Sequence, residues 1–449
     1  MSALAAKNPA PTLDRYRALS DARYTAPDAF TALRRRSLAS FLAAGFPTQR
    51  DENWKYTNLR RLESRNFVPA QCAPVAPDES QWIADAGTRI VLVNGHWMPS
   101  LSSPSPQPPG VTVLTLGRWI ANQPAEAAAF LEKADAGQPL TALEHMNDAF
   151  VEDGVVIDIA DGVALDQPVY VIHQWSPGAS LQMSHPRIVV RAGRGSSVSL
   201  VEHYVGHGDQ ETFTNARVSI ELGAGARMHH FRLQQESVRG FHIGNTRARL
   251  DRDSRYCSHD LALCGSLARV NITALLQGTG AEASLRGLFV PDGTQHIDTQ
   301  TRVEHVAAHT TSNEEYRGVA DGRGRGIFNG KVLVHAGAQK IDSRQSSRNL
   351  LLSPTAQIDT KPELEIYAND VKCSHGATTG QLDANSLFYL RSRGISAIEA
   401  RALLIRAFAE SILASIDHAP VRKYLEHRLH ARFAGIAQGD TQASNGVLS

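Results

Sequence analysis

Residues 222–281 read LGAGARMHHFRLQQESVRGFHIGNTRARLDRDSRYCSHDLALCGSLARVNITALLQGTGA, and this stretch decides the predicted fold. It contains three corners of small and polar residues, 222–226, 250–254 and 277–281, which begin 28 and then 27 residues apart. Short segments typical of strands lie between these corners. Corners at a nearly regular period predict a coil of stacked rungs, in which each rung buries its inner face against the next.

The same pattern of short strand-like segments between corners extends from residue 151 to residue 382, where helical patterns are almost absent. Short β-branched runs between glycine-rich corners predict strands at 155–157, 169–172, 187–190 and 198–201. The later corners, at 338, 356 and 377, are 18 and then 21 residues apart, so the repeat is loose. We therefore predict a mainly β chain with a parallel β-helix core over 151–382. A β-sandwich with long hairpins is the alternative that the pattern leaves open.

The regions on either side of this core are predicted to be helical. Residues 1–150 form an N-terminal helical region with a proline-rich loop at 99–110, where five prolines and four serines occur. Residues 28–44 show an apolar face at helical spacing and are followed by Gly45 and Pro47, a usual helix stop. A shorter helical segment is expected around 125–150.

Residues 383–435 form the predicted C-terminal helical module. Asp383 can cap a first helix that stops at Gly394, and Ser396-Ala-Ile-Glu399 is a capping box that starts a second. Pro420 opens a last helix. Beyond Gly435, residues 436–449 are predicted to be a flexible tail. The module carries more apolar surface than its helices can bury against one another, so we expect it to pack on the rungs, on a partner, or on both.

Composition excludes several classes of function. The chain has 449 residues with 46 Lys+Arg against 45 Asp+Glu, so no overall field attracts nucleic acid or an anionic membrane. No stretch approaches the roughly 18 apolar residues of a membrane span. Four cysteines are too few for a disulfide framework, and the first residues do not resemble a secretory signal. We therefore expect a cytoplasmic protein that binds neither nucleic acid nor membrane.

Two familiar motifs are incomplete. Gly330-Lys331 is followed by Val332 instead of the Ser or Thr of a nucleotide-binding loop, so we expect that the chain does not hydrolyse ATP itself. His305 and His309 have the spacing of a zinc helix but lack its glutamate, and they lie in a strand region. Cys257 and Cys264 are too far apart for a metal clamp and are interpreted as buried structural thiols.

Cys373 and His375 are the pair of residues whose side-chain chemistry points most strongly to a functional site. On a strand, residues i and i+2 point to one face, roughly 6.5–7 Å apart. Thiolate and imidazole suit iron or zinc, and Lys372 nearby would favour the thiolate. Two ligands do not hold a cluster that needs four, so any site must be transient or completed by another chain. A purely structural role for these residues remains open.

Residues 361–383, KPELEIYANDVKCSHGATTGQLD, and 387–394, LFYLRSRG, closely resemble the most specific block of the SufB/SufD family, scaffold proteins of SUF iron–sulfur cluster assembly. TRVEH at 301–305, FNGKV at 328–332 and NLLLS at 349–353 fit the family pattern in order. DENWKYT at 51–57 and VNG at 93–95 match weaker N-terminal signatures. The four cysteines and the string KCSHGA at 372–377 favour the SufD branch over SufB.

This resemblance implies a right-handed parallel β-helix flanked by helical modules, and a non-enzymatic scaffold. It implies pairing with SufB through the β-helices and binding of the ATPase SufC by the C-terminal helices. The nascent cluster would form at the junction with SufB, where His375 is the leading candidate for a transient iron ligand and Cys373 the second. No tightly bound cofactor is expected for this chain alone. The expected contacts with SufC are Arg391, Arg393, Glu399, Leu404 and Phe408.

Two other functions remain as alternatives. The first is a purely structural homo-oligomer, because the surface meant for SufB would be free in an isolated subunit and could form a homodimer. The second is a β-helix enzyme that acts on carbohydrate. Enzymes of that kind are usually secreted, and the absence of a signal argues against this alternative.

Overall fold

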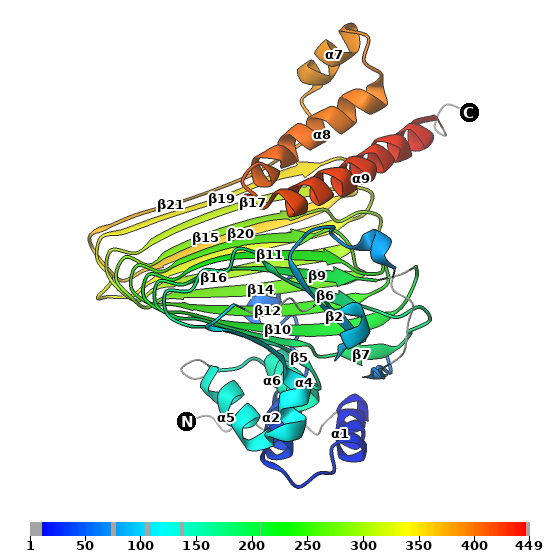
Figure 1. The fold of residues 1–449 in the computed structure, drawn as a ribbon. Coiled ribbons are helices and arrows are strands. Elements are labelled where there is room, and N and C mark those ends of the chain that lie inside the picture. The colour runs from blue at the N-terminus through cyan, green and yellow to red at the C-terminus, as the bar shows by residue number, and fades with distance from the viewer. Residues whose placement is uncertain (1–10, 73–77, 104–107, 135–138, 207, 446–449) are drawn as a thin grey trace.

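The computed structural model describes residues 11–72, 78–103, 108–134, 139–206 and 208–445. It is a parallel β-solenoid of about eight turns with helices at both ends (Figure 1). The predicted fold class is thereby confirmed, and the β-sandwich alternative is wrong, because consecutive turns pair in parallel across two sheets.

The first sheet runs from the N-terminal end of the solenoid to its last turn. Its strands, in spatial order, are β4 (Val111–Thr115), β5 (Gly154–Ile159), β8 (Arg187–Ala192), β10 (Thr212–Leu222), β12 (Phe241–Leu250), β14 (Leu267–Leu276), β16 (His296–His305), β18 (Arg325–Val334) and β20 (Gln357–Ile366). The short strands β1 (Val68–Pro69) and β7 (Gln182–Ser184) pair beside β10.

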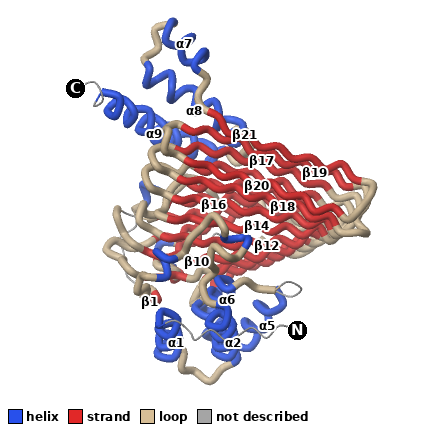
Figure 2. The backbone as a smooth tube through the Cα atoms, turned by 180° about the vertical axis from the view of Figure 1, so that it is seen from behind, coloured by secondary structure: helices blue, strands red, loops and turns tan. Residues whose placement is uncertain are grey.

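The second sheet faces the first. Its strands, in spatial order, are β3 (His96–Trp97), β2 (Thr88–Val93), β6 (Val169–Gln174), β9 (Ser197–Val205), β11 (Arg227–Gln235), β13 (Arg255–Ala262), β15 (Glu282–Phe289), β17 (Thr311–Ala320), β19 (Ile341–Leu351) and β21 (Val371–Gly380). Because the chain alternates between the sheets, Figure 2 shows the strands as two stacked layers wound by one continuous backbone.

The core lies between the two sheets and follows from the alternation of side chains along each strand. In β14, Ala268, Val270 and Ile272 point inward and belong to the interior apolar cluster, whereas Asn271 and Thr273 point outward. The inward residues of successive strands stack in register, since Ile272 lies beside Thr301 of β16. Stacking of this kind buries each rung on its neighbours.

The corners identified in the sequence are the turns between the sheets. Gly225, Asp253 and Gly280 occupy equivalent positions with φ of 70°, 55° and 76°. Glycine adopts this left-handed conformation without penalty, and aspartate tolerates it. The corners also hydrogen-bond to one another, because the Gly225 amide donates to the Arg252 carbonyl at 2.7 Å and the Asp253 amide to the Thr279 carbonyl at 3.0 Å.

The N-terminal region combines helices with the short strands β1, β2, β3 and β4 of the two sheets. The helices are α1 (Pro11–Arg23), α2 (Ala29–Ala44), α3 (Arg60–Glu63), α4 (Leu116–Asn122), α5 (Pro124–Ala134) and α6 (Ala142–Phe150), with short 3₁₀ turns at Glu52–Trp54, Glu79–Gln81 and Pro99–Leu101. Besides the predicted helices, the region contributes strands that were not predicted, because β2 pairs with β6 and β4 with β5. These short apolar strands extend both sheets, which sequence periodicity over five or six residues does not reveal.

The C-terminal helices are α7 (Ala384–Ser392), α8 (Ala397–Leu413) and α9 (Ala419–Asn445). Asp383 caps α7, and Ser396 and Glu399 form the predicted capping box of α8. Ile405, Ile412 and Leu425 pack with the outward residues of the second sheet in one apolar cluster. The α8 and α9 helices therefore cover part of that sheet, while α7 projects from the body (Figure 1).

The α9 helix continues beyond Gly435 and ends at Asn445, within the segment predicted to be a flexible tail. The reason is that Ile436, only 5 % exposed, continues the buried face formed by Leu429 and Phe433. The last four residues of the predicted tail lie outside the described residues.

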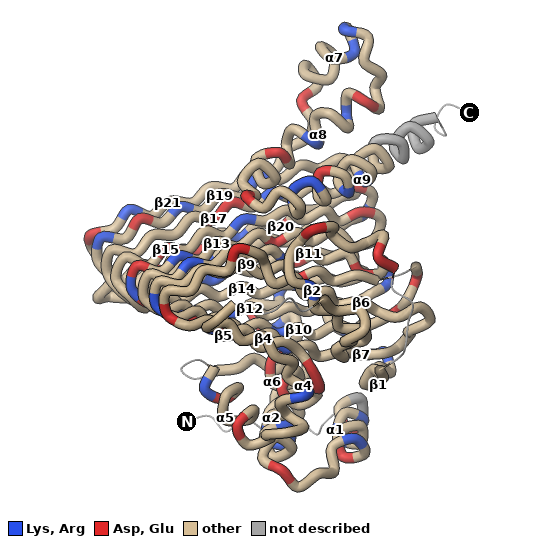
Figure 3. The backbone as a smooth tube through the Cα atoms, viewed as in Figure 1, with Lys and Arg blue, Asp and Glu red and all other residues tan. Residues whose placement is uncertain are grey.

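Lys and Arg positions are interspersed with Asp and Glu positions along the backbone (Figure 3). Within the described part of the chain, none of the helices is both long and apolar enough to cross a membrane.

Candidate functional site

The last turn of the solenoid ends in two edge strands. Strand β20 pairs with β18 and β21 pairs with β19, and within the described ranges no strand lies beyond either of them (Figures 1 and 2). Most side chains of β21 are exposed, whereas those of β17, two strands earlier, are buried on alternate positions. An unpaired edge presents backbone donors and acceptors to which a strand of another chain can bind.

Cys373 and His375 lie on the inward face of β21. Their register partners on β19 are Ser343 and Gln345, which are buried between the sheets at 1 % and 4 % exposure. Alternate residues share a face, so the thiol and the imidazole lie on the same side of the strand, roughly 6.5–7 Å apart. The structure therefore brings these two predicted residues together at the open end of the solenoid.

The environment of the Cys373 thiol does not favour the thiolate, contrary to the expectation based on Lys372. Burial raises the pKa of the Cys373 thiol above its usual value, and the nearby Asp342 carboxylate raises it further. Lys372, which we expected to favour the thiolate, is adjacent in sequence and so points to the opposite face of β21. The isolated chain therefore keeps Cys373 as a thiol, and a bound metal would have to displace its proton.

A chain of buried hydroxyls leads inward from Cys373. Ser343 Oγ lies 2.8 Å from Ser312 Oγ on β17, and Ser312 Oγ lies 2.9 Å from His305 Nε2. The Nδ1 atom of His305 lies 2.7 Å from Thr310 Oγ1, and burial lowers the pKa of this histidine to about 4. His305 is thus a neutral member of an internal hydrogen-bonded chain.

The other histidines and cysteines considered as metal ligands in the sequence do not come together in the structure. His309 is exposed at a corner with φ of 60°, away from the interior position of His305. Cys257 and Cys264 are half-buried free thiols whose pKa values are raised by burial. No group of three or more potential metal ligands occurs among the residues that the structure describes.

An exposed apolar surface covers α7 and the facing side of α8, and we call it the α7–α8 surface. Phe388, Tyr389 and Leu403 are 74 %, 56 % and 38 % exposed, and α7 has no buried residue. Leu404 and Tyr389 line a shallow pocket of about 510 Å³ between the two helices. The α7–α8 surface is therefore available to a partner.

The five residues expected to contact SufC fall in different places. Arg391 and Arg393 are exposed at the end of α7, where Arg393 donates to the Tyr389 hydroxyl at 2.8 Å. Glu399 accepts hydrogen bonds from Ser396 in the capping box. Phe408 is half-buried against the solenoid, with the Arg317 guanidinium 5.1 Å from its ring centre, so it anchors α8 to β17.

Phe388, Tyr389 and Leu403 are not among the five residues that the sequence reasoning named as contacts with SufC. A signal was present, because 387–390 is a run of four large apolar residues within a nine-residue helix. Such a run surrounds the helix and cannot be buried on one face.

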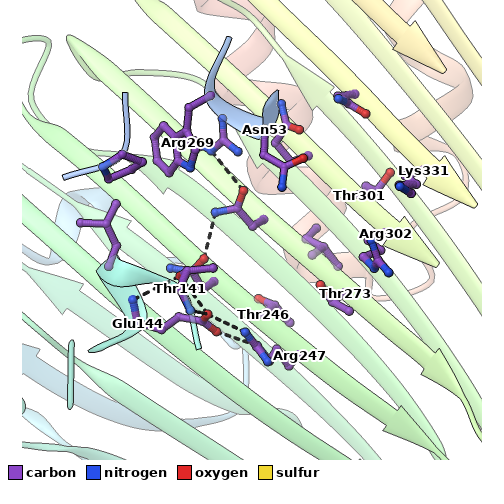
Figure 4. Close-up of a pocket in the computed structure, with 18 of the residues that line it drawn as sticks. Asn53, Thr141, Glu144, Thr246, Arg247, Arg269, Thr273, Thr301, Arg302 and Lys331 are labelled. Atoms are coloured by element: carbon purple, nitrogen blue, oxygen red, sulfur yellow. Dashed lines mark hydrogen bonds and ion pairs between the residues drawn. The ribbon is translucent and has the colours of Figure 1, made fainter. Parts of the chain in front are cut away.

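A polar groove of about 850 Å³ lies on the outer face of the first sheet, beneath the Glu52–Trp54 turn and the start of α6 (Figure 4). Its cationic side chains are engaged in the structure itself. Arg247 pairs with Glu144 at 2.5 Å, Arg269 with Asp298 at 2.6 Å, and Lys331 with Glu365 at 2.6 Å. The first of these pairs fastens α6 to β12, and the other two join neighbouring strands of the first sheet.

Two known protein-family models match most of the chain. A family model described as "SUF system FeS cluster assembly, SufBD core domain" matches residues 174–408, and one described as "SufBD protein N-terminal region" matches residues 16–171. The chain belongs to the SufBD family. This confirms the family predicted from the sequence. The SufBD core match includes β21 with Cys373 and His375, as well as α7 and most of α8.

Relatives from distant organisms align over nearly the whole chain. The iron–sulfur cluster assembly protein SufD of Escherichia coli is 30 % identical over 405 residues, covering 89 % of this chain and 92 % of that protein. A SufBD family protein of Synechocystis is 32 % identical over 418 residues, covering 90 % and 92 %. The chloroplastic protein ABCI7 of Arabidopsis thaliana is 27 % identical over 424 residues, covering 90 % and 87 %. The SufBD family, and this chain within it, is involved in iron–sulfur cluster assembly.

Proposed function

We propose that this chain is a cytoplasmic, non-enzymatic scaffold subunit that pairs with SufB and with the ATPase SufC. The nascent cluster forms at the junction with SufB, where His375 supplies a nitrogen to iron and Cys373 a second donor. The observation that carries the proposal is the position of both residues on the inward face of an uncovered edge strand. A partner solenoid that continues the stack at this edge would enclose them.

A site completed by another chain fits the donor set. Cys373 and His375 provide two of the four ligands that a cluster needs, so the others must come from SufB. Coordination shared between two chains can be opened by separating them, which keeps the cluster available for transfer. The cluster is therefore the cargo of this scaffold and not its resident cofactor.

The α7–α8 surface is the proposed binding site for SufC. The aromatic side chains of Phe388 and Tyr389 are the kind that anchor protein interfaces, and Arg391 and Arg393 lie beside them. The α8 helix packs on β17 through Phe408, and β17 is two strands from β21 in the second sheet. Movement of SufC upon ATP binding would thus act on the edge of the solenoid through α8.

Co-expression of this chain with SufB and SufC tests the proposal. The expected product contains one copy of this chain, one of SufB and two of SufC, measured by native mass spectrometry. Ala377→Lys places a charge on the inward face of β21 beside the position of Ser347, and we expect it to remove SufB from the complex. Thr378→Lys on the outward face is the matched control and should retain SufB. A chain that co-purifies with neither partner would contradict the proposal.

A second candidate is a homodimer through the same edge. The open β20 and β21 strands favour it, because an isolated subunit leaves them unpaired. Light scattering of the isolated chain would give twice the mass of 48.8 kDa if it forms. Ala377→Lys should then return the chain to a monomer. The carbohydrate-acting alternative is set aside, because the family takes part in cluster assembly.

A further inference from the structure

Three inward-facing side chains are stacked on successive strands of the second sheet, and we call them the inner column. Glu314 of β17 lies beside Gln345 of β19, which in turn lies beside His375 of β21. Neighbouring strands are about 4.8 Å apart, so each side chain can reach the next one. Glu314 and Gln345 are buried at 1 % and 4 % exposure, while His375 is exposed at the end of the column.

The amide of Gln345 is held in one orientation from below. Its Nε2 atom donates to Glu314 Oε1 at 3.2 Å, and the other carboxylate oxygen of Glu314 accepts a hydrogen bond from the Thr301 hydroxyl. Gly330, on the opposite sheet, leaves the space that the amide occupies, since a Cβ atom there would lie 2.0 Å from Gln345 Nε2. The amide nitrogen is therefore committed to Glu314.

The oxygen of the same amide is buried and accepts no hydrogen bond from the described residues. Gln345 Oε1 has no hydrogen-bond partner in the described part of the protein. Burying a carbonyl without a partner is costly, so native structures rarely keep one without a reason. The next residue in the column is His375, whose ring carries the N–H group that this oxygen lacks.

We propose that Gln345 is a positioning residue for His375. The two side chains are not hydrogen-bonded in this structure, and a turn of the exposed imidazole lets Oε1 accept a hydrogen bond from one ring nitrogen. That bond fixes the tautomer and leaves the other nitrogen to face the edge of the solenoid. Partners of this kind orient metal-binding histidines in many proteins. Glu314 acts one step further back, because it fixes which end of the amide points toward His375. The benefit to iron binding rests on the proposed function, whereas the contact itself does not.

The contact is tested by NMR on the isolated full chain labelled with ¹⁵N-histidine, with the His375 signals assigned from their loss in His375→Gln. In the unmodified chain we expect one of the two His375 tautomers to dominate. The control is Ser347→Ala, which changes a buried residue of β19 beside Ala377 and should show the same dominant tautomer. Gln345→Met, similar in length but without an acceptor, should show both tautomers. An unchanged tautomer ratio in Gln345→Met would overturn the proposal.

A second measurement separates this proposal from the proposed function. In the complex with SufB and SufC, Gln345→Met should assemble normally but mature clusters at least about tenfold more slowly. Gln345→Glu keeps an acceptor oxygen toward His375, with one proton held between its carboxyl group and that of Glu314, and should restore most of the rate. If Gln345→Met changes the tautomer but His375→Ala still matures clusters, the iron-ligand role fails and the positioning contact stands. Equal loss in Gln345→Met and Gln345→Glu would show a merely structural role for Gln345.

Discussion

Arg217 of β10 donates two hydrogen bonds through Nη1 to the carboxylate of Asp148 on α6, at 2.9 and 3.0 Å. Arg187 of β8 donates to the same carboxylate at 3.2 Å, and both guanidinium groups are fully buried. Asp148 thus pairs with two buried cations on neighbouring strands, and Glu144 of α6 adds a second carboxylate 3.6 Å from Arg217 Nε. This arrangement joins α6 to the first turns of the solenoid.

The first prediction concerns this junction. Asp148→Ala leaves two buried charges without their shared partner, and removing one side of a buried pair typically costs about 3–5 kcal/mol. We expect a loss of that size in the free energy of unfolding, measured by urea denaturation. Asp161→Ala, which breaks the exposed pair with Arg194, is the control and should leave the midpoint unchanged. Similar midpoints for the two variants would show that the junction does not depend on Asp148.

The second prediction concerns the proposed ligand. His375→Ala removes the imidazole from the uncovered edge, so the complex with SufB and SufC should still assemble but fail to mature clusters. The measurement is transfer of iron–sulfur clusters to an acceptor protein, followed by absorbance. Ser374→Ala changes the adjacent residue on the outward face of β21 and should retain the normal rate. Normal maturation by His375→Ala would remove the iron-ligand role.

Much of this fold could be predicted because it is repetitive. The corners at 222, 250 and 277 mark turns whose left-handed residue recurs, and the helix caps at Asp383 and Ser396 are local signals. Strands β2 and β4 could not be predicted, since their assignment depends on pairing with β6 and β5 far along the chain.

For the site, the period of two along a strand was enough to place Cys373 and His375 on one face. It could not show what lies beneath them. Glu314 and Gln345 are separated from His375 by 61 and 30 residues, and only the register of three strands brings them together. The elevated pKa of the thiol likewise depends on burial and on Asp342, which no local pattern reveals.

The third prediction concerns the α7–α8 surface. Phe388→Ser removes the most exposed large apolar side chain of the described residues, at 74 % exposure, so it should not change the thermal midpoint of the isolated chain. We expect it to abolish co-purification of SufC, because aromatic anchors dominate protein interfaces. Val238→Ser, at 48 % exposure on a distant loop, is the control and should retain SufC. Retention of SufC by Phe388→Ser would place the ATPase elsewhere.

The last prediction concerns acid stability and rests on His173 of β6. Its ring stacks on Tyr204 at 4.4 Å between centroids, and neither ring nitrogen has a hydrogen-bond partner within the described residues. Burial lowers the pKa of His173 to about 4, although Glu202 and Glu236 oppose this shift. Because the folded pKa is below the unfolded value of about 6.5, this group supports stability above pH 6.5 and loses that contribution as pH falls toward 4.

His173→Phe keeps the stacked ring and cannot bind a proton. Between pH 7.5 and pH 5 the unmodified chain should therefore lose about 2 kcal/mol more of its free energy of unfolding than His173→Phe does. Urea denaturation at the two pH values measures this difference, and contributions from the other buried histidines cancel in it. The exposed His427→Gln should show the same pH dependence as the unmodified chain. If His173→Phe showed the same change in free energy of unfolding between the two pH values as the unmodified chain, protonation of His173 would not contribute to the loss of stability in acid.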